Sequence, residues 1–85
     1  GPYVLVNTGG IVEHDSKLGQ HTMVSPGAVV LGKVEVGELC LLGANSTILP
    51  GLSLAKGTTL GAGGTLTKNV TEANRTLVGV PADFV

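Results

Sequence analysis

The chain has 85 residues, a formal net charge of −1, and Tyr3 and Phe84 as its only large aromatic side chains. This length is expected to form one domain, spanning residues 1–85. Five basic against six acidic residues argue against nucleic-acid binding, and no apolar run is long enough to cross a membrane. Without a signal peptide, we expect a cytoplasmic protein.

A repeat of six residues dominates the chain from position 6 to position 70. Every sixth position is aliphatic, and the position two residues before it is mostly small. The aliphatic series is Val6, Val12, Leu18, Val24, Val30, Val36, Leu42, Ile48, Leu54, Leu60 and Leu66. A short period sustained over so many repeats is typical of a solenoid.

The repeat predicts very short strands joined by corners. Residues two apart in a strand point to the same side, so the small and the aliphatic residue face inward and the one between them faces outward. The other three residues of each repeat are rich in Gly, Asn, Asp and Pro, which favour tight turns. We expect three strands per triangular coil, with coils at 6–23, 24–41 and 42–59 and a fourth beginning at 60.

The last segment, 71–85, departs from the repeat. Residues 71–75 are polar and predict a loop, and residues 76–80 predict a closing strand that ends at Pro81. A solenoid needs such a cap over its core. No equivalent precedes the first coil, and we expect the chain to be a piece of a longer protein.

The outward residues predict how the prism associates. Two faces begin apolar and one is charged. The first carries Ile11, Val29, Thr47 and Thr65, the second Met23, Leu41 and Thr59, and the charged face Lys17, Glu35 and Ser53. Exposed apolar strips on a small protein usually contact a partner. The two apolar faces flank the corners at 7–9, 25–27, 43–45 and 61–63, so we expect this edge to face a three-fold axis in a homotrimer.

The candidates for chemistry are few. His14 lies at the centre of a corner between Glu13 and Asp15, where an exposed imidazole beside carboxylates is either a general base or a solvated turn residue. His21 is read as a surface residue. Cys40 occupies an inward position and is read as part of the core.

The sequence resembles the left-handed parallel β-helices of bacterial hexapeptide-repeat acyltransferases. Residues 7–15, Asn-Thr-Gly-Gly-Ile-Val-Glu-His-Asp, resemble the signature of sugar acetyltransferases that act on sialic acid hydroxyls or on UDP-linked 4-amino sugars. Residues 42–46 and 60–66 continue the likeness, which covers nearly the whole chain. The resemblance implies an all-β fold of about four triangular coils.

The resemblance also assigns roles to individual residues. His14 is the implied catalytic base and Asp15 its orienting acid, with Asn7 and Glu13 at the substrate. The family usually has a second histidine near the acetyl thioester, and Met23 stands at that position. Either a backbone amide takes over its role or activity is altered.

The implied acyl donor is acetyl-CoA, bound in a groove between subunits. Its contacts fall on Met23, Gly32, Ala44 and Ala62, and Lys68 is placed to meet its phosphates. The implied reaction is direct transfer to a sugar amine or hydroxyl, with no metal and no covalent enzyme intermediate. The later segments favour N-acetylation of a UDP-linked 4-amino sugar over O-acetylation.

Two other readings stay open. A metalloenzyme like the γ-class carbonic anhydrases needs three histidine ligands, whereas this chain has two, seven residues apart. A non-catalytic trimeric scaffold is the second alternative. It stays open because Met23 stands where the family usually has its second histidine.

Overall fold

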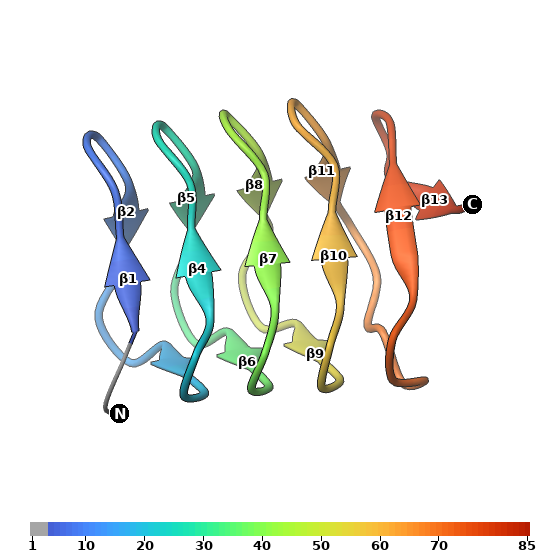
Figure 1. The fold of residues 1–85 in the computed structure, drawn as a ribbon, viewed down its shortest axis with the longest axis horizontal. Helices are drawn as coiled ribbons and strands as arrows, with labels where there is room; N and C mark the ends of the chain where they lie inside the picture. Colours follow the sequence, from blue (N-terminus) through green and yellow to red (C-terminus); the bar gives the residue numbers. More distant parts are fainter. Residues whose placement is uncertain (1–3) are drawn as a thin grey trace.

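The computed structural model describes residues 4–85, which form short strands and no helix (Figure 1). The strands are β1 (Leu5–Val6), β2 (Ile11–Val12), β3 (Lys17–Leu18), β4 (Met23–Val24), β5 (Val29–Val30), β6 (Glu35–Val36), β7 (Leu41–Leu42), β8 (Thr47–Ile48), β9 (Ser53–Leu54), β10 (Thr59–Leu60), β11 (Thr65–Leu66), β12 (Thr76–Val78) and β13 (Asp83–Phe84). None of the described residues forms a helix that is long and apolar enough to cross a membrane.

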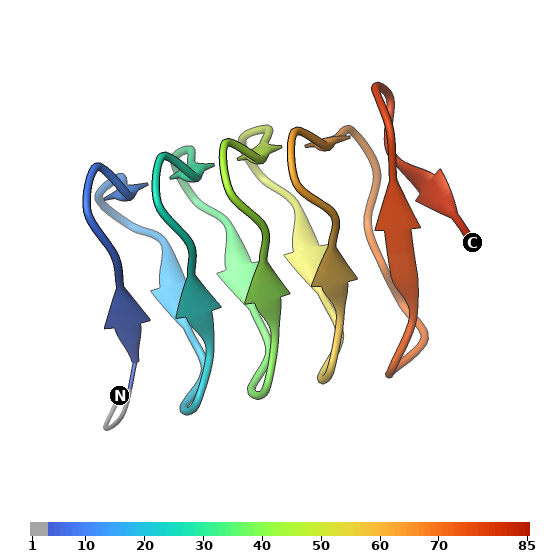
Figure 2. The ribbon, with the colours of Figure 1, turned by 45° about the horizontal axis from the view of Figure 1, so that its top comes forward.

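Three sheets wrap the chain into a three-sided prism. Their strand orders are β1-β4-β7-β10-β12-β13, β11-β8-β5-β2 and β3-β6-β9. The front strands of Figure 1 run upward, and the chain then passes behind and downward while advancing to the right, which is a left-handed path. The predicted left-handed parallel β-helix is therefore confirmed, with β1 and β13 at opposite ends of the prism (Figure 2).

Register follows the sequence repeat, because each paired residue of β1 to β11 has its partner eighteen positions away. Met23 pairs with Leu41, and Val30 pairs with Ile48. Every aliphatic position from Val24 onward is buried, with Leu42, Ile48 and Leu60 at 0% exposure. In the first coil the same positions are less covered, and Val6 is 44% exposed, because no described strand stacks on that side.

The corners obtain their geometry in two ways. From the corner at 7–9 to that at 61–63, the third residue has a positive φ whether or not it is glycine, as at Gly27 (73°), Leu39 (58°) and Asn45 (57°). Glycine at the first corner position serves a different need, since a Cβ on Gly43 would lie 2.6 Å from the Ala62 nitrogen. Glycine is therefore favoured at the first corner position by the close approach of the next coil, and at the third position by the turn conformation.

The C-terminal cap differs from the single closing strand predicted for residues 76–80. The strand β12 ends at Val78, and β13 returns antiparallel to it, pairing Leu77 with Phe84. The last coil is one residue shorter than the others, because Thr59 pairs with Thr76. The resulting hairpin covers the end of the core, where Leu77 is fully buried.

Candidate functional site

The predicted site residues are distributed over the edges of the prism, which we name by one residue each. The His14 edge comprises the corners at 13–15, 31–33, 49–51 and 67–69. The Ala44 edge comprises the corners at 7–9, 25–27, 43–45 and 61–63. The Glu38 edge comprises the corners at 19–21, 37–39 and 55–57.

His14 projects from its edge into solvent. Its side chain is 90% exposed, and its Nε2 lies 4.0 Å from Asp15 Oδ2. That separation exceeds a hydrogen bond. Asp15 has the left-handed corner conformation, with a φ of 64°. The expected base and acid are neighbours, but Asp15 does not fix the imidazole in the single chain.

Two other predicted residues share the His14 edge. Gly32 stacks one coil above His14, and a Cβ on it would lie 3.9 Å from the His14 carbonyl oxygen. The Gly32 carbonyl accepts a hydrogen bond from the Gly51 N–H at 3.0 Å. Lys68 lies two coils beyond Gly32 at the capped end, where its ammonium pairs with Asp83 at 2.8 Å. The edge thus carries an imidazole at one end and a cation at the other, with Gly32 and Pro50 at the corner centres between them.

The remaining predicted contacts lie elsewhere on the prism. Ala44 and Ala62 are one coil apart on the Ala44 edge, where the Ala44 carbonyl accepts a hydrogen bond from Gly63 at 2.8 Å. Asn7 begins that edge and donates from Nδ2 to the Val24 carbonyl at 3.4 Å. The sheet β2-β5-β8-β11 separates this edge from His14. A single chain therefore does not bring the two groups together.

Met23 and Glu13 complete the predicted set. Met23 is 41% exposed on β4, stacked between Leu5 and Leu41 on one apolar face. Glu13 is exposed at the start of the His14 corner. The described residues enclose no pocket, so any closed site needs a second surface.

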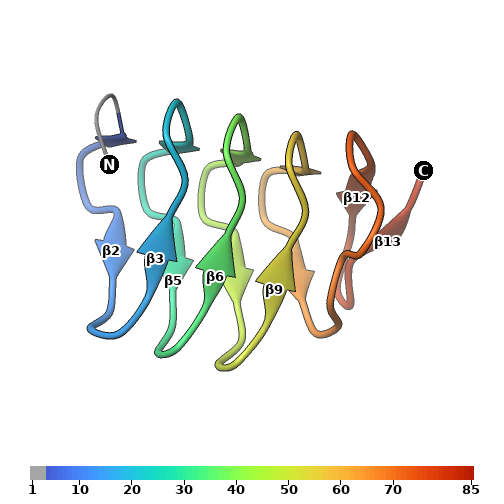
Figure 3. The same cartoon turned by 90° about the horizontal axis from the view of Figure 1, so that it is seen from below.

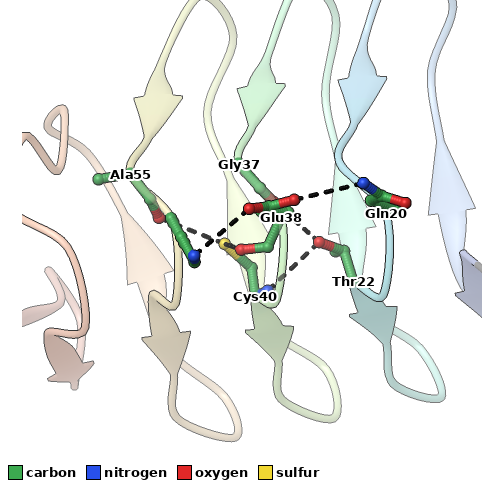
Figure 4. Close-up of polar contacts among 7 residues, drawn as sticks. Gln20, Thr22, Gly37, Glu38, Cys40 and Ala55 are labelled. Atoms are coloured by element: carbon green, nitrogen blue, oxygen red, sulfur yellow. Dashed lines mark hydrogen bonds and ion pairs between the residues drawn. The ribbon is translucent and has the colours of Figure 1, made fainter.

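The Glu38 edge holds contacts within the chain (Figure 4). Glu38 accepts a hydrogen bond from Gln20 at 3.5 Å and pairs with Lys56 at 3.4 Å. Behind it, the Cys40 thiol is buried and donates to the Ala55 carbonyl at 3.4 Å. Burial raises the pKa of this thiol, which keeps it protonated and disfavours nucleophilic chemistry.

A metal centre has no support among residues 4–85, which contain no group of three His, Cys, Asp or Glu side chains placed to hold an ion. His14 and His21 lie on different edges. The histidine set of a γ-class carbonic anhydrase is thus not assembled within the described part of the chain.

A charged cluster around Phe84 was missed by the sequence reasoning. The Lys68 ammonium and the Arg75 guanidinium lie 4.7 Å and 4.0 Å from the centroid of the Phe84 ring. Arg75 also pairs with Glu72, and Lys68 with Asp83. No sequence signal reveals the cluster, because the hairpin that places Phe84 lies beyond the repeat.

Comparison with known proteins identifies the repeat. A family model described as bacterial transferase hexapeptide (six repeats) matches residues 15–50. The matched segment runs from the corner of His14 into the third coil and covers less than half of the chain. A comparison with curated protein sequences finds no significant match.

Solved structures extend the likeness over the hexapeptide coils and the cap. A UDP-N-acetylglucosamine acyltransferase superposes with a TM-score of 0.91 at 26% identity, covering 95% of this chain and 31% of that one. The N-acyltransferase AntD from Bacillus cereus, bound to dTDP-4-amino-4,6-dideoxyglucose and coenzyme A, gives 0.90 at 16% identity, covering 98% and 59%.

A perosamine N-acetyltransferase variant from Caulobacter crescentus, bound to CoA and GDP-perosamine, gives a TM-score of 0.74 at 22% identity, covering 99% of this chain and 54% of that one. The chain therefore spans between about a third and three-fifths of the length of these three structures. At 16% and 22% identity, the comparisons with AntD and with the perosamine N-acetyltransferase show a shared fold and nothing more.

Proposed function

We infer that the chain is the β-helix part of an acetyl-CoA-dependent acetyltransferase that acts on the amino group of a nucleotide-linked sugar. The observation that carries the proposal is that two structures of matching fold hold coenzyme A together with a nucleotide-linked amino sugar. An exposed histidine beside carboxylates on one edge of the prism supports it. A cytoplasmic location, where both substrates are available, belongs to the proposal.

His14 is the general base in this reaction. It accepts a proton from the sugar amine as the nitrogen attacks the thioester carbonyl, and the C–N bond forms. The carbonyl oxygen becomes an oxyanion, for which a backbone N–H of the His14 edge is the proposed donor. The intermediate collapses with cleavage of the C–S bond, and the CoA thiolate leaves and takes up a proton. Asp15 orients the imidazole.

The site is proposed to close only in a homotrimer, because His14 is exposed and the described chain encloses no pocket. Asn7 and Glu13 are proposed on the sugar side, and Met23, Gly32 and Lys68 on the donor side. Ala44 and Ala62 fit this scheme only as contacts from a neighbouring subunit, because their edge is separated from that of His14. These contacts and the predicted trimer exclude each other: an edge that faces the three-fold axis cannot also line a groove that opens outward, so only one of the two proposals can hold.

The non-catalytic scaffold remains the second candidate, favoured by Met23 at the position of the second histidine and by the unfixed His14 side chain. Binding of acetyl-CoA, measured by calorimetry, distinguishes the two, since a scaffold binds none.

Replacement of His14 tests the catalytic proposal. We expect His14→Ala to lower acetyl transfer to a UDP-4-amino sugar by about two to four orders of magnitude, the usual effect of losing a general base. Because the side chain is exposed, the melting temperature and the oligomeric state should not change. His21→Ala is the control, since His21 is the other exposed corner histidine and lies on the Glu38 edge, outside the proposed site. A loss below threefold for His14→Ala would exclude the role of general base.

A further inference from the structure

The cap places two cations around one aromatic ring. Lys68 Nζ and Arg75 Cζ lie 4.7 Å and 4.0 Å from the Phe84 centroid, so the two charges cannot be farther apart than the sum of these distances. Each cation is held by one carboxylate, Lys68 by Asp83 and Arg75 by Glu72. The cluster is therefore neutral in the free chain.

Both ion pairs are accessible and easily exchanged. The Asp83 and Glu72 side chains are 75% and 71% exposed, and Lys68 and Arg75 are 44% and 35% exposed. Pairs of this kind contribute little stability, because water solvates the separated charges well. An anion with more charge than one carboxylate, and with several acceptor oxygens, competes favourably for the same cations.

The cluster also lies at a useful place relative to His14. Lys68 occupies the same edge as His14, three coils further along. At about 4.8 Å per stacked strand, the two are separated by roughly 14 Å along the prism. A ligand that reacts at one end and carries a diphosphate at the other can reach both.

We propose that Lys68 and Arg75 form a diphosphate-binding site beside Phe84, and that Asp83 and Glu72 occupy this site until the ligand displaces them. The inference rests on the proposed function for its ligand class, since both the acyl donor and a nucleotide-linked sugar carry a diphosphate. The Lys68–Asp83 contact then acts as an internal competitor that lowers the affinity for the diphosphate.

Asp83→Asn is the informative variant. It removes the competing charge, while an amide oxygen still accepts the hydrogen bond that the Phe84 N–H donates to Asp83 Oδ1 at 2.8 Å. Lys68→Gln removes the cation itself. Glu35→Gln is the matched control, because it makes the same change in net charge on β6, outside the cluster and the proposed site.

Calorimetric titrations of these proteins with CoA, UDP, pantetheine and inorganic pyrophosphate test the site. We expect Asp83→Asn to tighten binding of the relevant diphosphate by about two- to fivefold, the factor that corresponds to losing one exposed ion pair. Lys68→Gln should weaken it by at least as much. Glu35→Gln should match the wild type, and pantetheine, which lacks phosphate, should bind all four proteins equally. Whether CoA or UDP responds identifies the source of the diphosphate.

Three outcomes overturn the inference. The first is that Asp83→Asn and Glu35→Gln bind CoA and UDP with equal affinities. The second is that the affinity for pantetheine changes among the variants in the same way as the affinity for the diphosphates. The third is that the wild-type protein binds none of the phosphate probes. Acetyl transfer that proceeds while Asp83→Asn and Lys68→Gln have no effect removes this site and leaves the proposed function standing. Conversely, pyrophosphate binding that responds to both variants without any acetyl transfer keeps the site and removes the function.

Discussion

At the scale of single residues, the left-handed corner positions determine how costly each corner is to fold. Gly27 and Gly51 have nearly the same positive φ, 73° and 79°. A Cβ on Gly51 would meet no atom within 4 Å, whereas one on Gly27 would collide with the Asn45 side-chain oxygen. We expect Gly51→Ala to lower the free energy of unfolding by about 1 kcal/mol for the backbone conformation alone. Gly27→Ala should lower it by up to about 1 kcal/mol more, because the exposed Asn45 side chain must turn away from the new Cβ. Urea denaturation of both variants measures the difference, and equal losses would show that Asn45 moves aside without cost.

The residue scale also shows what the sequence can and cannot predict. The alternation of small and aliphatic residues was sufficient to place Leu42, Ile48 and Leu60 inside, because inward positions have one repeated environment. Positive φ at Leu39 was not predictable, since the coil imposes that conformation on whichever residue reaches the third corner position. The roles of His14 and Asp15 were inferred from the resemblance to sugar acetyltransferases. Because the imidazole and the carboxylate are not hydrogen-bonded in the single chain, these roles are still proposals.

At the scale of elements, the strands and their pairing followed from the repeat, but the cap did not. Each of the strands β1 to β11 falls on a repeat position, and Figure 3 shows β3, β6 and β9 aligned in successive coils. The β12–β13 hairpin depends on how the chain turns back over its own end. Contacts between segments that do not share the repeat, such as Lys68 with Asp83, have no periodic signal.

The cap leads to a prediction about acid. The hydrogen bond from Lys68, together with one from the Phe84 backbone, lowers the pKa of Asp83 below its ordinary value of 3.8. A carboxyl with a depressed pKa in the folded state stabilises the protein above the unfolded value and loses that contribution as pH falls through the folded value. We therefore expect the melting temperature of the wild type to fall more steeply than that of Asp83→Asn below about pH 4. Thermal melts of both proteins between about pH 2 and pH 6, a range that covers the titration of an ordinary carboxyl group, make the comparison. Parallel curves of melting temperature against pH would contradict the prediction.

At the scale of the whole molecule, the prism has two apolar faces and one charged face, and this asymmetry is the basis for the predicted trimer. Leu5, Met23 and Leu41 are 48%, 41% and 40% exposed in one row, and Ile11 is 52% exposed on the next face. On the third face, Lys17 and Glu35 are neighbours in the register of β3 and β6. Burial of an apolar strip lowers the free energy of the protein, whereas burial of a charged strip does not. Copies of the chain should therefore associate through the two apolar faces and leave the charged face in water.

Leu41→Glu tests this arrangement, with Ser53→Glu as the matched control. Both positions are outward strand residues exposed to solvent, one on an apolar face and one on the charged face. A glutamate at position 41 would bury an unpaired charge in the interface, so we expect the variant to sediment near the monomer mass of 8.5 kDa. The wild type and Ser53→Glu should sediment at three times that mass. Since position 41 points away from the core, the variant should keep its β-sheet circular dichroism. A wild type that is monomeric at micromolar concentration would remove the trimer, and with it the second surface that the proposed site at the His14 edge requires.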